Sequence, residues 1–95
     1  MSKKLIMVTG GGGGLGEAIC RRADALGYRV LVVDRNLKAA QEVSRSLSDA
    51  QAMAVDVTRE AEVQALVDGL PQTPDVLVNN AGIGRFGPLM DMALS

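Results

Sequence analysis

Cysteine and histidine are nearly missing from this 95-residue sequence, which has one cysteine, Cys20, and no histidine. A single cysteine excludes an internal disulfide and any zinc site built from several thiolates. It is also typical of proteins from a reducing compartment. The carboxylates Asp68, Asp75 and Asp91 fall on separate predicted elements, so we assign no metal site.

Long apolar runs and an excess of one charge are absent as well. The apolar stretch after Lys3 and Lys4 has about four residues, fewer than the ~7–15 of a signal-peptide core. No window approaches the ~18 apolar residues of a membrane span. The net charge is −1, without the basic stripe expected of a nucleic-acid binder. These absences predict a cytoplasmic protein that binds neither membranes nor nucleic acids.

Glycine, by contrast, is concentrated in residues 9–16, which read Thr-Gly-Gly-Gly-Gly-Gly-Leu-Gly. This run follows the apolar segment Leu5–Val8 and precedes a segment with helical periodicity. Without side chains the backbone can approach a ligand closely, and a helix N-terminus attracts phosphate through its N–H groups and its dipole. The run predicts a pyrophosphate site, with a flexible turn as the alternative. A P-loop is excluded, because no Lys-Ser or Lys-Thr follows.

Four short apolar runs alternate with three segments of helical periodicity. The runs are typical of parallel strands buried on both faces: Leu5–Val8, Val30–Val33, Met53–Val55 and Val76–Val78. The apolar helical faces comprise Leu15, Ile19, Ala23 and Leu26; Leu37, Ala40, Val43 and Leu47; and Val63, Leu66, Val67 and Leu70. We expect Asn36 to cap the second helix, Thr58 to lead into the third, and Gly27 to stop the first.

Right-handed crossovers between these elements predict an α/β fold. The expected architecture is a doubly wound, Rossmann-like parallel sheet of four strands in the order 3-2-1-4, with flanking helices. We interpret Cys20, inside the first predicted helix, as a small core residue.

Asp34 ends the second run, eighteen positions after Gly16. A carboxylate at this place can accept hydrogen bonds from an adenosine ribose, with a soluble turn residue as the alternative. Asp34 repels a 2′-phosphate, whereas the guanidinium of Arg35 could bind one or stack on adenine. We therefore favour NAD as cofactor and keep NADP as possible.

Two further segments follow the third and fourth runs: Asp56-Val57 and Asn79-Asn80-Ala81-Gly82. Together with Thr9-Gly10, Gly14 and Gly16, they make the chain resemble the short-chain dehydrogenase/reductase family over essentially its whole length. The glycines alone fit two spacings, G-x-G-x-x-G from Gly11 and G-x-x-x-G-x-G from Gly10. The resemblance selects the second spacing.

The resemblance also implies a role for each motif. Thr9 would tie the glycine loop to the segment after the fourth strand. The implied pyrophosphate contacts are Gly10, Gly14, Leu15 and Gly16. Asp34, with Arg35 beside it, would bind the adenosine ribose, and Asp56 and Val57 the adenine. The implied contacts to the nicotinamide ribose are Asn80, Ala81 and Gly82.

The catalytic residues of the family have no counterpart in this sequence. The family uses a Tyr-x-x-x-Lys pair and a Ser beyond a fifth strand, but the one tyrosine, Tyr28, is followed at position 32 by Val. We expect residues 1–95 to be the N-terminal NAD(P)-binding Rossmann domain of an oxidoreductase, with the catalytic half absent. The whole enzyme would transfer a hydride between a nicotinamide and an alcohol or ketone, and the isolated chain would be inactive.

A stand-alone nucleotide-binding or interaction module without enzymatic activity is the alternative. Assembly with a separately supplied C-terminal half is a third hypothesis. In the stand-alone module the fourth predicted strand, Val76–Val78, would leave its backbone N–H and C=O groups unpaired at the sheet edge. Such an edge favours self-association.

Overall fold

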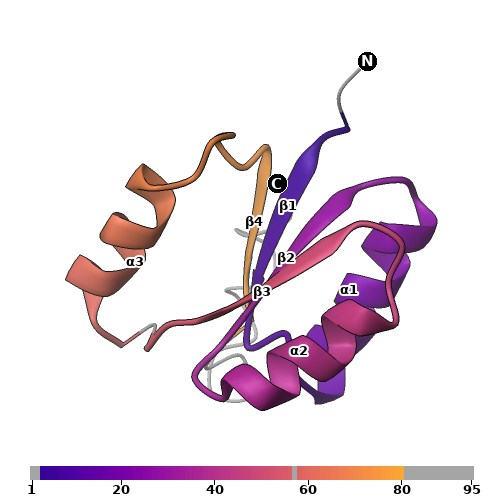
Figure 1. The fold of residues 1–95 in the computed structure, drawn as a ribbon, viewed down its shortest axis with the longest axis horizontal. Helices are drawn as coiled ribbons and strands as arrows, with labels where there is room; N and C mark the ends of the chain where they lie inside the picture. Colours follow the sequence, from indigo (N-terminus) through magenta and orange to yellow (C-terminus); the bar gives the residue numbers. More distant parts are fainter. Residues whose placement is uncertain (1–2, 57, 81–95) are drawn as a thin grey trace.

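A computed structural model describes residues 3–56 and 58–80 (Figure 1). Its strands are β1 (Leu5–Thr9), β2 (Arg29–Asp34), β3 (Ala50–Ala54) and β4 (Val76–Asn79), and its helices are α1 (Gly14–Ala25), α2 (Leu37–Arg45) and α3 (Glu60–Asp68). All strand pairs are parallel, in the order β3-β2-β1-β4. The predicted fold class and strand order are confirmed.

The helices form two layers around the sheet. Helices α1 and α2 lie on one side of it and α3 on the other (Figure 1). Alternate residues of the central strands point to opposite faces, so Val8 and Val32 pack with Cys20 under the first layer. Met7 and Val33 belong to the core on the α3 side. This arrangement brings the carboxyl ends of all four strands to one edge of the sheet.

Strand burial differs from the prediction at the sheet edges. Strand β3 spans Ala50–Ala54 rather than Met53–Val55, because Ala50 and Ala52 pair with Val30 and Val32 of β2 although alanine carries no strand signal. Strands β1 and β2 are buried on both faces. Within the described residues β3 and β4 are the edge strands, and Leu77 of β4 is 46% exposed.

The buried face of α1 also differs from the prediction. Leu15 and Leu26 were expected to face the sheet but are 47% and 61% exposed. The buried residues of this helix are Gly16, Cys20 and Ala23. Small side chains on this stripe let the helix backbone lie close to the strands. The interpretation of Cys20 as a core residue is confirmed.

The helix ends are partly as predicted. The Asn36 side chain accepts a hydrogen bond from the Ala39 N–H at 3.2 Å, which confirms it as the cap of α2. Helix α1 ends at Ala25, close to Gly27. Thr58 leads into α3 as expected: Arg59 is at the N-cap position, and the Thr58 hydroxyl donates a hydrogen bond to Asp56.

Candidate functional site

The glycine loop connects the carboxyl end of β1 to the first turn of α1. Gly10 and Gly14 have φ angles of 65° and 55°, a left-handed conformation that costs other residues energy. The loop is tied to β2, because the Gly11 N–H donates to the Val33 carbonyl at 3.0 Å. Crevices at the carboxyl ends of parallel strands are the usual ligand sites of this architecture.

Gly16 allows the first turn of α1 to pack on the start of the loop. A Cβ atom at Gly16 would collide with the Gly10 carbonyl oxygen and would lie 2.6 Å from the Asn80 Nδ2 atom. No side chain fits there without a backbone shift. Gly16 is therefore needed for the shape of the loop, whatever the loop binds.

Thr9 and Asn80 hold the loop against the end of β4. The Thr9 Oγ1 atom lies 3.3 Å from the Val78 carbonyl oxygen and accepts a hydrogen bond from the Asn80 N–H at 3.0 Å. The Asn80 side chain donates from Nδ2 to the Gly10 carbonyl at 3.1 Å. The predicted tie through Thr9 is confirmed. Asn80 braces the loop as well, a role that the sequence reasoning missed.

The loop has the features of an anion site. A Cβ atom at Gly13 or Gly14 would meet nothing within 4 Å, so the backbone there faces open space. No side chain caps α1, and among the described residues none accepts a hydrogen bond from the N–H groups of Gly14, Leu15 or Gly16. First-turn N–H groups together with the helix dipole favour a phosphate. A pyrophosphate fits this cradle.

Asp34 lies beside the loop at the carboxyl end of β2. Its Oδ2 atom accepts a hydrogen bond from the Gly12 N–H at 3.0 Å, and its Oδ1 atom accepts one from the Asn36 N–H at 3.0 Å. The carboxylate is thereby fixed next to the glycine loop. Gly12 was not among the predicted site residues, although it is the loop residue that contacts Asp34. Its position inside the glycine run was the available signal.

Asp56 and Arg35 lie at the carboxyl ends of β3 and β2. The Thr58 hydroxyl and N–H donate to Asp56 Oδ1 at 2.6 Å and 3.0 Å. These hydrogen bonds, and secondarily the positive charges of Arg35 and Arg59, lower the pKa of Asp56 below its ordinary value. The structure therefore keeps an anionic carboxylate and a guanidinium at this side of the glycine loop.

Several sequence-predicted residues are not part of this arrangement. Val57, Ala81 and Gly82 lie outside the described residues. Tyr28 precedes β2 and packs against the core at the opposite end of the sheet. Burial raises the pKa of the Cys20 thiol to about 12, which disfavours the nucleophilic thiolate. No group of three or more metal-ligating side chains occurs within residues 3–56 and 58–80, and no helix there is long and apolar enough to cross a membrane.

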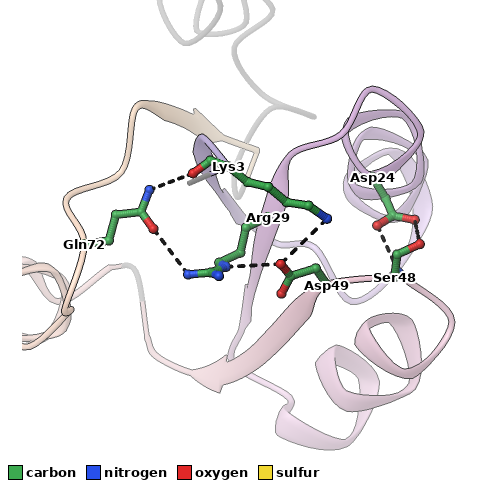
Figure 2. A network of polar contacts seen from close by, with 6 residues as sticks. All are labelled: Lys3, Asp24, Arg29, Ser48, Asp49 and Gln72. Carbon is green, nitrogen blue, oxygen red and sulfur yellow. Dashed lines mark hydrogen bonds and ion pairs between the residues drawn. The ribbon is translucent and has the colours of Figure 1, made fainter. Parts of the chain in front are cut away.

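The opposite end of the sheet carries a network of polar contacts (Figure 2). Arg29 and Lys3 both pair with Asp49, at 3.3 Å and 3.7 Å. Gln72 bridges the Arg29 guanidinium and the Lys3 carbonyl, at 3.4 Å and 3.0 Å. These contacts join the first residue of β2 to the segments that precede β1, β3 and β4.

Known proteins match this chain over nearly its full length. The family model for short chain dehydrogenases matches residues 4–95. An uncharacterized oxidoreductase, YuxG of Bacillus subtilis, is 39% identical over 98% of this chain, which spans 15% of that protein. The meso-2,3-butanediol dehydrogenase of Serratia marcescens is 34% identical over 96% of this chain, which spans 38% of it.

Solved structures match in the same way. A metagenomic short-chain oxidoreductase in complex with NADP superposes with a TM-score of 0.81 and 34% identity, over 92% of this chain and 42% of that one. A hydroxysteroid dehydrogenase from Escherichia coli superposes with a TM-score of 0.73 and 34% identity, over 80% of this chain and 35% of that one. The chain thus spans less than half of each of these relatives. Its motifs, its fold and these similarities show that it belongs to the short chain dehydrogenase family.

Proposed function

We propose that residues 1–95 form the cofactor-binding domain of an NAD(P)-dependent oxidoreductase that acts on an alcohol or ketone. The observation that carries this proposal is the open cradle at Gly13 and Gly14, at the N-terminus of α1 and beside the fixed Asp34 carboxylate. Membership of the family supports a nicotinamide dinucleotide as the ligand.

Each part of the cofactor has a counterpart in the site. Gly10, Gly14, Leu15 and Gly16 would hold the pyrophosphate. Asp34, with Arg35 beside it, would bind the adenosine ribose, and Asp56 and Val57 the adenine. Asn80, Ala81 and Gly82 would border the nicotinamide ribose. The bound nicotinamide would supply the hydride chemistry, and the protein would supply binding and orientation.

We propose NAD as the preferred cofactor. The carboxylate of Asp34 can accept hydrogen bonds from ribose hydroxyls but repels a 2′-phosphate. The metagenomic relative was solved with NADP, so the family fold alone does not select between the two cofactors.

The isolated chain is expected to bind cofactor without turning over substrate. Proton transfer to or from the substrate oxygen needs a positioned acid or base, and the sequence has no Tyr-x-x-x-Lys pair. We expect binding to be weak and to depend mainly on the ADP half of the cofactor. Titration with NADH, followed by competition with ADP, tests this. Competition by ADP supports the proposal. No saturable NADH binding would refute it, and affinity as tight as that of a complete relative would refute the weak-binding part.

A stand-alone nucleotide-binding or interaction module is the second candidate. It would use the same open cradle at Gly13 and Gly14 to hold a nucleotide without any chemistry on a substrate. Intact-mass measurement on protein from its natural source, with fragmentation sequencing past Ser95, separates the two. A longer chain with Tyr-x-x-x-Lys supports the oxidoreductase. A native mass near 9.9 kDa supports the module.

Self-association through the β4 edge is part of the proposal for the isolated chain. Within the described residues β4 pairs only with β1, and no lysine lies in the strand to discourage pairing. A hollow of about 440 Å³ adjoins it on the α1 side, bordered by Ile19, Leu26 and Val76. We further propose a cytoplasmic location, which suits the free thiol of Cys20.

A further inference from the structure

A polar groove lies between α1 and α2, next to the glycine loop. Its volume is about 220 Å³, and its lining consists of Gly12, Glu17, Arg21, Ala39, Glu42 and Val43. Nothing in the proposed function uses its charged residues. Arg21 is the one cation among these lining residues. Whether the groove attracts or repels an anion therefore depends on whether the Arg21 guanidinium is free to bind it.

All three nitrogen atoms of the Arg21 guanidinium already donate hydrogen bonds, to two partner residues. Its Nε and Nη2 atoms donate to Glu17 Oε2 at 2.9 Å and 2.6 Å. Its Nη1 atom donates to Ser46 Oγ at 3.0 Å. The pair is half-exposed, with 50% of the Arg21 side chain and 35% of the Glu17 side chain accessible. Glu17 therefore neutralises Arg21 and directs it along the helices, toward the end of α2.

The groove meets the proposed ribose site at Gly12. The Gly12 N–H donates to Asp34 Oδ2, and a Cβ atom at Gly12 would lie 2.8 Å both from that oxygen and from the Ala39 Cβ atom. Gly12 and Ala39 both line the groove. A group attached to a ribose held by Asp34 would therefore lie near the end of the groove.

We propose that Glu17 is a specificity-determining residue that disfavours a 2′-phosphorylated cofactor by holding Arg21. This inference rests on the proposed function. A phosphate monoester carries about −1.5 to −2 charges at neutral pH. Near the groove it meets Asp34, Glu17 and Glu42, while the Arg21 guanidinium is kept on other partners. A 2′-hydroxyl carries no charge and is unaffected.

Arg21 and Arg35 have different surroundings, so their effects on cofactor preference can be distinguished. Arg35 follows Asp34 in the chain and is not among the residues that line the groove, and its charge acts on Asp56. If Arg35 were the group that decides between the cofactors, changes at Glu17 would leave the preference unchanged. Glu17 acts through Arg21 in our proposal, so the effect of Glu17 must disappear when Arg21 is removed.

The test is a comparison of NADH and NADPH dissociation constants at low ionic strength. The variants are Glu17→Gln, the double variant Glu17→Gln with Arg21→Gln, and Asp49→Asn. Asp49→Asn is the matched control, because Asp49 is also a half-exposed partner of an arginine, at the opposite end of the sheet. Circular dichroism verifies that each variant is folded.

We expect the wild type to bind NADH more tightly than NADPH. Glu17→Gln should lower the ratio of the NADPH to the NADH dissociation constant about threefold, the scale of one exposed charge interaction. The double variant and Asp49→Asn should keep the wild-type ratio. A wild type that prefers NADPH, an unchanged ratio in Glu17→Gln, or an equal change in the double variant would overturn the inference. A wild type that binds neither nucleotide would overturn the proposed function and this inference together.

Discussion

Gly16 packs directly against the backbone carbonyl of Gly10, so the first turn of α1 touches the residue that begins the glycine loop. A Cβ atom at Gly16 would collide with that carbonyl, and the same carbonyl accepts the Asn80 side-chain hydrogen bond at 3.1 Å. The glycine loop, the first turn of α1 and Asn80, which is distant in the sequence, therefore meet at one oxygen atom. The shape of the proposed phosphate cradle depends on this meeting point.

Gly16→Ala is expected to destabilise the fold. The new methyl group must displace backbone rather than a flexible side chain, which costs about 1–3 kcal/mol of unfolding free energy. Gly13→Ala is the control, because its Cβ atom meets nothing within 4 Å and its φ of −177° is extended. That change should stay within about 0.5 kcal/mol. Urea unfolding followed by circular dichroism measures both, and equal stabilities would contradict the packing argument.

Asp34→Ala is expected to weaken NADH binding at least about tenfold, because a hydrogen bond to a charged group contributes about 1.5–3 kcal/mol. The Gly12 and Asn36 N–H groups lose their acceptor in the same variant, so its stability is measured alongside. Asp68→Ala serves as the control, since Asp68 lies on α3 and its side chain accepts a hydrogen bond from Gln64. Unchanged affinity in a folded Asp34→Ala protein would exclude Asp34 from the ribose site.

The Cys20 thiol is expected to be inert in the folded protein. Burial raises its pKa from 9.0 to about 12, so the reactive thiolate is disfavoured at neutral pH. Labelling with a disulfide reagent should be slow in buffer and fast in urea. Equal rates would show that Cys20 is accessible in the native state.

The raised pKa of Cys20 also predicts how the free energy of unfolding changes at alkaline pH. Between pH 9 and 12 the unfolded thiol ionises while the folded thiol does not, so the free energy of unfolding falls as pH rises through this window. Below pH 9 the thiol is protonated in both states and has no such effect. Cys20→Ala should lose stability less steeply than wild type above pH 9. Parallel profiles would contradict the assigned shift.

Leu77→Lys is expected to reduce self-association. Leu77 is 46% exposed on the edge strand β4, and lysine at a sheet edge opposes strand pairing. Leu37→Lys is the control, because Leu37 is 42% exposed but lies on α2. Analytical ultracentrifugation at high concentration should show oligomers for wild type and the control, and monomers for Leu77→Lys. A monomeric wild type would refute association through β4.

The sequence predicted the central features of the fold because their signals are local. The β-branched runs at Val30 and Val76 and the cap at Asn36 each lie within one element. The β3 bounds were missed because Ala50 and Ala52 become a strand only by pairing with β2. The buried face of α1 was predicted wrongly in part, because Gly16 has no apolar side chain and yet packs closely against the Gly10 carbonyl.

The candidate site could also be predicted only where its signals are local in the sequence. The glycine run and Asp34 follow from strand–loop–helix spacing and were identified. The Gly12–Asp34 hydrogen bond, the Asn80 brace and the Glu17–Arg21 pair beside the loop depend on how separate elements lie in space. No local pattern in the sequence specifies those contacts.

The most direct test of the account is an amide NMR titration of the 95-residue chain with NADH. Binding at the glycine loop predicts saturable shifts of the amides of residues 10–16, Asp34 and Asn36. The amides of Arg29, Asp49 and Gln72, at the opposite end of the sheet, should not move. Shifts centred on the opposite end, or no saturable shifts at all, would contradict the proposed nucleotide site.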